Sequence, residues 1–479
     1  MQKDEEIAKK NKLPGLFTKY STTRAAVWAV AWPAVAIGLL RTALGQVDAY
    51  QIGRLGSLEL QAMGAASFLV WTIYILGDLA AVGVHALCSE AEGRGDRKEI
   101  AKSVCQGLWF SLIISFFTAI ITWPRIESNQ DIIFLYLKLI GIENSYVTQA
   151  AADYLRVTAI FGTFPLAASA VASSGFKGIG ETRAALAIAF GTVALNAILN
   201  IFFIQRLGVP GAAWATNLSA LVAFFASILV LAKKHHIFIL KYLFHSKNLP
   251  SFSSIIKIAQ IGAPIASSGF FFSLIYIVLG RLISAIDPIF LAALGIGHRI
   301  EALAYSACEG YAIGAATCVG IWLGADEEQK ARHTATTAAR IAIATLLPVS
   351  ILTLLFAPFA ASFFSSGDIH VATAATNYLR IVALVFPVMA IDSVYEGSLT
   401  GAQRTLPALV ATVIGSFLRI PLALCLIPYF GVNGVWIAIA ATTLFKAPAK
   451  YFAFRTADIR LSSSGTTRRS LALSPSSAG

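Results

Sequence analysis

Charge is scarce in this chain. Only 13% of its 479 residues are Asp, Glu, Lys or Arg, whereas 57% are hydrophobic. A soluble globular chain carries about 25% charged residues, so this composition excludes an ordinary soluble domain. Alternation of apolar and polar residues is also missing, which argues against a transmembrane β-barrel. The mean hydropathy of +0.72 and apolar runs long enough to cross a bilayer of about 30 Å predict a polytopic membrane protein.

The sequence also lacks the motifs of cofactor chemistry. Its five cysteines are odd in number and show no CxxC spacing, so neither a disulfide framework nor a zinc site is predicted. A P-loop, a kinase signature and an HExxH motif are missing, which argues against ATP as the energy source and predicts no cofactor. The glycines of GFKGIGETR, residues 175–183, lie between two apolar segments and not between a strand and a helix, so they predict a tight turn.

The basic residues are distributed in a way that predicts an orientation. The net charge is +12, but no basic patch with interleaved aromatic residues indicates a nucleic-acid partner. With the N-terminus in the cytoplasm, the inside loops hold most of the Lys and Arg residues, such as Arg94, Arg97, Lys233 and Lys234, as the positive-inside rule requires. Both termini are therefore expected on the cytoplasmic side. The N-terminal stretch has no apolar core of its own, so it does not resemble a signal peptide.

A sliding-window reading finds twelve apolar segments, and the predicted fold class is all-α with twelve transmembrane helices. The segments are 25–48, 59–84, 100–123, 149–174, 181–205, 209–232, 254–284, 289–321, 333–364, 374–399, 404–428 and 432–456. The predicted domains are a cytoplasmic tail (1–23), an N lobe (24–240), a C lobe that includes the linking loop (241–458) and a disordered tail (459–479).

Three motifs occur twice, in the same order and about 223 residues apart. YLRVTAIFGTFP at 154–165 resembles YLRIVALVFP at 378–387, GIGETR at 178–183 resembles GAQRT at 401–405, and GVPGAAW at 208–214 resembles GVNGVW at 431–436. A duplication with six helices in each copy gives two parallel lobes related by an axis along the membrane normal. Two pseudo-symmetric lobes around a central cavity suit a carrier that works by alternating access, whereas a channel or a receptor does not need them.

The chain resembles the multidrug and toxic compound extrusion (MATE) transporters over about residues 24–456. The resemblance rests on VDAYQIGRLGSLELQAMG after the first apolar segment, Pro33 within it, GFKGIGETR, NAILN and GVPGAAWAT. It implies twelve helices in two lobes and export of organic cations, drugs or organic acids in exchange for H⁺ or Na⁺. The wording IGRLGSLELQAMG is similar to the DinF-like branch, which has plant and plastid members. The resemblance thus allows a plasma membrane or a plastid membrane, with cytoplasmic or stromal termini.

Asp48 is the first candidate site residue, because ionisable groups near hydrocarbon are costly and usually functional. The alternative is an interfacial carboxylate solvated at a helix end. The resemblance implies that Asp48 binds the coupling ion together with Asn196, Asn200 and Thr216. Asn196 and Asn200 are four apart and lie on one helix face. The family often has Asp where this chain has Asn200, and this loss of a charge favours H⁺ over Na⁺.

Burial disfavours the charged form of a carboxylate, so a buried Asp48 would load and release a proton. Arg41, seven residues earlier, lies on roughly the same helix face. A permanent ion pair between them would instead keep Asp48 charged. The sequence leaves both arrangements open.

The second lobe has its own candidate substrate or proton residues. These are Glu301 and Arg299 in the eighth segment and Asp392 and Glu396 in the tenth. Like charges four apart on a helix repel, so one of Asp392 and Glu396 is expected to be protonated, paired or at the cytoplasmic rim. Arg299 is an alternative ion-pair partner for Glu301 or Asp392, and Arg419 is expected to neutralise an acid or bind an anionic substrate.

The leading hypothesis is a monomeric secondary active antiporter in the lipid bilayer, whose partners are a small organic substrate and H⁺ or Na⁺. The alternative within transport is a lipid-linked oligosaccharide flippase, whose relatives share the fold but lack the IGRLGS and NAILN wording. An intramembrane enzyme would need a convergent His/Asp or Ser/His set or a metal motif, and the sequence shows none.

Overall fold

The computed structural model of the protein describes residues 15–20, 22–124, 131–142, 144–237, 239–243, 250–365 and 367–459. Every regular element in these ranges is a helix, which confirms the all-α fold class. The predicted disordered tail beyond Ile459, most of the N-terminal tail and part of the basic linking loop lie outside the described residues.

Each of the twelve predicted segments is helical in the structure, as a single helix or as consecutive helices. The N lobe holds α3 (Thr23–Gly53), α4 (Ser57–Gly93), α5 (Arg97–Thr122), the broken rod α7 (Ser145–Arg156), η1 (Val157–Gly162) and α8 (Thr163–Gly178), then α9 (Thr182–Leu207) and α10 (Val209–His235). The C lobe holds α12 (Phe252–Ile286), α13 (Ile289–Gly324), α14 (Glu328–Phe364), the pair α15 (Ile369–Ala383) and α16 (Phe386–Gly401), the pair α17 (Thr405–Phe417) and α18 (Arg419–Phe430), then α19 (Val432–Thr456). Three short helices complete the described chain: α2 (Gly15–Lys19), α6 (Ile132–Leu139) and α11 (Ile239–Leu243).

Most of these helical segments are candidate membrane spans by their length and composition. Within the described residues, nine helices are long and apolar enough to cross a membrane, and the pair α15 and α16, bent by 55°, makes a tenth. The remaining two, α13 and α19, are 36 and 25 residues long. Both carry ionisable residues, and several of those residues are among the candidates discussed below.

The duplicated motifs occupy equivalent places in the two lobes. YLRVTAIFGTFP covers the break between α7 and α8, and YLRIVALVFP covers the bend between α15 and α16. Gly208 and Gly431 make the turns into α10 and α19 with φ of 65° and 55°, a backbone region that residues with a Cβ rarely adopt. The positive-φ glycine turns at matched positions support the predicted duplication.

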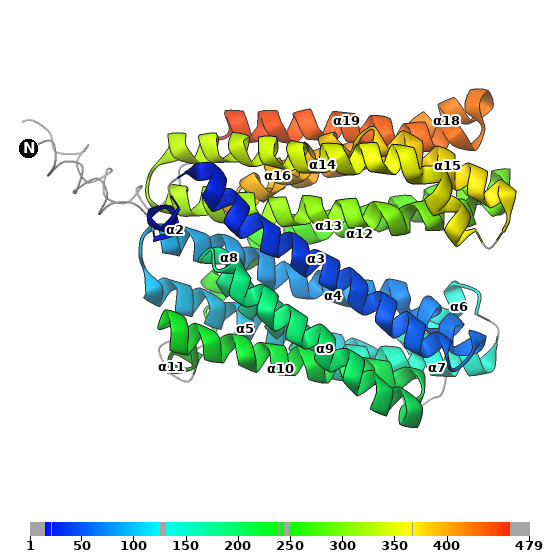
Figure 1. Cartoon of the computed structure of the whole chain (residues 1–479). Coiled ribbons are helices and arrows are strands. Elements are labelled where there is room, and N and C mark those ends of the chain that lie inside the picture. The colour runs from blue at the N-terminus through cyan, green and yellow to red at the C-terminus, as the bar shows by residue number, and fades with distance from the viewer. Residues whose placement is uncertain are drawn as a thin grey trace, which may run out of the picture.

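The lobes meet through helices α3 and α4 of the N lobe and α12 and α13 of the C lobe. Figure 1 shows the lobes close together at the end where α2 lies, here called the α2 end, and diverging toward the end where α6 lies, the α6 end. Near the α2 end, His85 contacts Thr317 at 2.9 Å and Gln403 donates to Glu90 at 2.5 Å. These polar contacts join the lobes at this end.

Glycines bring the backbones of the two lobes into direct contact at the α2 end. A Cβ at Gly262 would lie 1.8 Å from the Leu79 carbonyl oxygen, and one at Gly324 would lie 2.0 Å from the Glu90 carbonyl oxygen. Real Cβ atoms do not approach other atoms this closely, so these positions have room only for glycine. We call the interface between α4 and helices α12 and α13 at the α2 end the glycine seam.

Burial along the same helices changes toward the α6 end. Residues 88–92 of α4 and 314–324 of α13 are all buried. Nearer the α6 end, Trp71 of α4 is 37% exposed, Phe270 of α12 is 49% exposed and Tyr305 of α13 is 58% exposed. The two lobes therefore pack tightly together at the α2 end, and the same helices become more exposed toward the α6 end.

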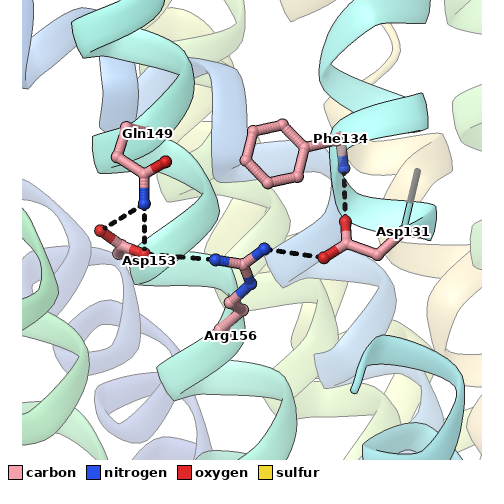
Figure 2. Close-up of polar contacts among 5 residues, drawn as sticks. All are labelled: Asp131, Phe134, Gln149, Asp153 and Arg156. Carbon is pink, nitrogen blue, oxygen red and sulfur yellow. Dashed lines mark hydrogen bonds and ion pairs between the residues drawn. The ribbon is translucent and has the colours of Figure 1, made fainter. Parts of the chain in front are cut away.

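A polar cluster fixes the short helix α6 against α7. Asp131 caps α6 by accepting from the Phe134 amide at 2.9 Å, and Arg156 donates to Asp131 at 2.7 Å (Figure 2). Arg156 also contacts Asp153 at 3.5 Å, and its guanidinium lies 5.1 Å from the Phe134 ring centroid. This cluster ties together the connection between α5 and α7 at the α6 end.

Candidate functional site

Asp48 lies near the end of α3 and is only 6% exposed. Its position answers one question that the sequence left open, because Asp48 is buried by protein and is not a solvated carboxylate at a helix end. The neighbouring helices α9 and α10 supply its polar surroundings. Asn196 and Asn200 of α9 are fully buried, and Thr216 of α10 is 8% exposed.

The four predicted N-lobe residues form one hydrogen-bonded network. The Asn200 Nδ2 group donates to Asp48 Oδ1 at 2.6 Å and to Asn196 Oδ1 at 3.2 Å. Asn196 Nδ2 in turn donates to Thr216 Oγ1 at 3.1 Å. The spacing of four residues brings both asparagines to the same side of α9, as the sequence predicts.

Amide oxygens that accept no hydrogen bond lie in the network and near it in the sequence, and Asp48 carries the network's single negative charge. In the described part of the chain, Asn200 Oδ1 is buried without a hydrogen-bond partner, and so is Oε1 of Gln51, three residues beyond Asp48. Buried acceptors without donors are costly, so these two oxygens are available to a donor or to a small cation. The chemistry available here is the reversible binding of one H⁺ or one small cation.

A cavity of about 180 Å³ adjoins this network inside the N lobe. Thr216 belongs both to the network and to the cavity lining. The lining also includes Arg41, Tyr74 and Asp78, among mainly apolar side chains. A mostly apolar pocket with a few polar groups is the usual form of a small-molecule site.

Arg41 lines the N-lobe cavity and contacts an acid of the other lobe, and it forms no ion pair with Asp48. Its Nη1 lies 4.0 Å from Glu309 Oε1 of α13. Among the described residues, Asp48 has no ion-pair partner within 4 Å. A permanent pair of Arg41 with Asp48, one of the two arrangements that the sequence allowed, is therefore not formed in this state.

The C-lobe acids are paired with lysines that sequence reasoning missed. Lys450 Nζ lies 2.9 Å from Asp392 Oδ1 and also contacts Glu396 Oε2, while Lys446 Nζ lies 3.6 Å from Asp392 Oδ2. Asp392 and Lys450 are 8% and 1% exposed. The acids are thus paired, one of the three outcomes predicted for them. The available signal was KAPAK in the last segment, whose lysines have the same spacing of four as Asp392 and Glu396.

Within the described residues, the other C-lobe candidates form no hydrogen bond or ion pair with this cluster. Glu301 accepts a hydrogen bond from the Tyr378 hydroxyl at 2.5 Å. Arg299 is exposed, and in the part of the chain that the structure describes it forms no ion pair with Glu301 or Asp392. Arg419 is 3% exposed, donates to the Thr442 hydroxyl at 3.0 Å and lies 5.5 Å from the ring centroids of Phe272 and Tyr276.

A search of the described residues finds no group of three or more His, Cys, Asp or Glu side chains that could hold a metal ion. Two six-helix lobes that pack together at one end and diverge toward the other, with buried ionisable residues in both lobes, are the architecture of a carrier-type membrane transporter. Comparison with known proteins gives the family. The MatE family model matches residues 33–202 and 264–425, which is more than half of the chain, and the chain belongs to this family of transporters, the MATE family. It is therefore a transporter and not an enzyme.

Relatives and solved structures agree with this assignment. The chain is 26% identical over 435 residues to the probable multidrug resistance protein NorM of Thermotoga maritima, covering 89% of this chain and 90% of the relative. It is 26% identical to the multidrug resistance protein PmpM of Pseudomonas aeruginosa, covering 85% and 86% of the two chains.

The fold is similar to that of solved MATE structures. A MATE crystal structure in the straight conformation has a TM-score of 0.81 at 22% identity, covering 90% of this chain and 95% of that chain. The outward-facing conformation of a multidrug resistance MATE family transporter of the MOP superfamily has a TM-score of 0.82 at 21% identity, covering 90% and 95%. These likenesses concern the fold.

Proposed function

We propose that the protein is a secondary active antiporter that exports organic cations, drugs or small organic acids in exchange for H⁺, with Asp48 as the coupling carboxylate. The observation that carries the proposal is the network around Asp48, a buried carboxylate held by Asn200 without a neighbouring cation. The relatives named as multidrug resistance proteins support the substrate class. The adjoining cavity, which shares Thr216 with the network, is a place for substrate and coupling ion to influence each other.

H⁺ is favoured over Na⁺ because the network offers one negative charge. Asn196, Asn200 and Thr216 contribute neutral groups only. Sodium binding requires several oxygen ligands to replace the ion's hydration shell. The Asn200 amide instead directs an N–H donor at Asp48, in a place where a metal ion would need an oxygen ligand. A proton needs one carboxylate whose charged form is disfavoured by burial.

The proposed cycle places this state at the point where substrate leaves and a proton enters. With the basic α2 end on the cytoplasmic or stromal side, the open α6 end faces the opposite compartment, because positive loops stay inside. Asp48 lies near the α6 end of α3, so a proton arriving from that compartment reaches it. Protonation removes the buried charge, and the lobes then rock to open at the α2 end. We propose a monomer in a plasma membrane or a plastid membrane.

Asn200→Asp is expected to increase the affinity of the network for Na⁺ and the dependence of export on a Na⁺ gradient. The substitution places a second carboxylate beside Asp48 and removes the donor directed at it. Two neighbouring acids raise the affinity for a cation, so a Na⁺ gradient at equal pH should drive export by the variant more strongly than by the wild type. Vesicle transport with one imposed gradient at a time measures this effect.

The control is Asn217→Asp, which adds a carboxylate at a buried asparagine of α10 that donates to the Val157 carbonyl, outside the network. A sodium response equal in the two variants would place Asn200 outside the coupling site.

A further inference from the structure

The C lobe contains a cluster of two acids and two lysines, of which Asp392, Lys446 and Lys450 are buried and Glu396 is partly exposed. Asp392 and Glu396 lie four residues apart on α16, and Lys446 and Lys450 lie four residues apart on α19. Lys450 contacts both acids, and Lys446 contacts Asp392 from the other side at 3.6 Å. Two acids and two lysines leave this cluster without net charge.

Lys450 holds the central position in this cluster. Its side chain is 1% exposed, and its ammonium group lies between a carboxylate oxygen of Asp392 and one of Glu396. Two acids four apart would repel each other if no cation lay between them. The ammonium of Lys450 therefore reduces the repulsion between the two carboxylates, as a monovalent cation bound at the same place would.

Lys446 is placed differently and does not duplicate this role. Its ammonium lies at 3.6 Å from Asp392, and its stem packs against α17, where a Cβ at Gly415 would come within 2.4 Å of Lys446 Cγ. Among the ion pairs of the described residues, Glu396 is paired with Lys450 alone. Removing the Lys450 ammonium would leave Glu396, whose side chain is 28% exposed, without its counter-charge, and would leave the buried Asp392 with only the more distant Lys446. A buried charge that loses its partner is strongly destabilising.

We propose that Asp392 and Glu396 form a monovalent-cation site that the protein fills permanently with its own Lys450. The ligand class of the underlying site is a primary alkylammonium ion, or a small inorganic cation such as Na⁺. In the context of the proposed antiport function, on which this consequence rests, the C-lobe acids are thereby withdrawn from ion coupling. The exchangeable coupling ion is then bound by the N lobe alone.

Lys450→Ala tests this proposal by emptying the site. The substitution removes a propylammonium group, so free n-propylammonium chloride is the matched probe. The measurement is the thermal unfolding midpoint of the purified full-length protein in n-propylammonium, sodium or choline chloride at equal ionic strength and at a pH well above the titration range of carboxylates. We expect the variant to unfold at a lower temperature than the wild type in choline, and n-propylammonium to restore most of that difference. Wild type should respond equally to n-propylammonium and choline.

The triple variant Lys450→Ala, Asp392→Asn, Glu396→Gln is the matched control, because it has the same cavity without the carboxylates. The proposal is supported if n-propylammonium or Na⁺ raises the unfolding midpoint of Lys450→Ala more than choline does, and if this difference is lost in the triple variant. The ratio of the effects of the two salts then identifies the better-fitting cation. Equal midpoints of Lys450→Ala in all three salts would overturn it. If the variant does not fold alone, extraction in n-propylammonium replaces the midpoint: recovery of folded protein there and not in choline supports the proposal, and recovery in neither overturns it.

This readout does not involve transport, so it separates the proposal from the proposed function. Repeating the measurement in an Asp48→Asn background removes any contribution of the N-lobe network. Retention of the n-propylammonium effect there assigns it to the C lobe, and its loss there would contradict the assignment.

Discussion

Asp48→Asn is expected to reduce gradient-driven export to the level of protein-free vesicles while leaving the protein folded. The variant keeps the size of the side chain and an oxygen that can accept from Asn200, but it cannot bind or release a proton. Replacing a charged acceptor by a neutral one weakens a hydrogen bond by about 1 kcal/mol, so the loss of stability should be small. Transport of a fluorescent organic cation into proteoliposomes under an imposed pH gradient measures the effect.

The pH dependence should change together with the rate. Wild-type export requires Asp48 to exchange a proton, so its rate should depend on the pH on both sides of the membrane, and any residual movement of substrate by Asp48→Asn should not. Asp153→Asn is the control, because that carboxylate is 42% exposed at the α6 end and pairs with Arg156. Equal rates for wild type and Asp48→Asn across the pH range would remove Asp48 from the coupling site.

Gly324→Val is expected to prevent closure of the glycine seam and to stop transport. Its Cβ would lie 2.0 Å from the Glu90 carbonyl oxygen of the other lobe, and backbone atoms on both sides leave no flexible group to move aside. Overpacked contacts cost about 1–3 kcal/mol, which corresponds to a shift of roughly 5- to 150-fold in a conformational equilibrium. The equilibrium should therefore move away from the state closed at the α2 end.

Cysteine labelling at the seam measures that shift. Ser89 is fully buried and faces Gly320 across the seam, so Ser89→Cys in a background without the native cysteines should be labelled slowly in the wild-type seam and much faster with Gly324→Val. Gly191→Val is the control, since a Cβ at Gly191 of α9 meets nothing within 4 Å. Slow labelling and normal transport in Gly324→Val would show that the seam is not a gate.

The positions of the helices could be predicted from the sequence because hydrophobicity sets them directly. All twelve predicted segments contain a helical rod, and the predicted start at 289 and end at 456 coincide with those of α13 and α19. The predicted end at 84 is earlier than that of α4, which continues to Gly93. The additional turns carry Glu90 and Glu92, polar residues that a hydropathy reading excludes although they are buried in the structure.

The candidate site was predictable only in part, because contacts between helices are not encoded in local spacing. The spacing of Asn196 and Asn200 predicted a shared helix face, but their meeting with Asp48 spans 152 residues of sequence and was expected only through the family resemblance. Lys446 and Lys450 lie on α19 and the acids lie on α16, and spacing within one helix does not indicate which basic residue of another helix an acid meets. The closed seam depends on how closely glycine backbones approach, which sequence periodicity does not report.

The most direct test of Asp48 as a proton-coupling site is transport in proteoliposomes with a single gradient imposed, for wild type and Asp48→Asn in parallel. Substrate movement and internal pH would be followed together in sodium-free buffer, and then with a Na⁺ gradient at equal pH. The account predicts that a pH gradient without Na⁺ drives substrate transport and proton counterflow in the wild type, and that both disappear in Asp48→Asn. Export driven by Na⁺ alone, or proton counterflow that persists in Asp48→Asn, would contradict it.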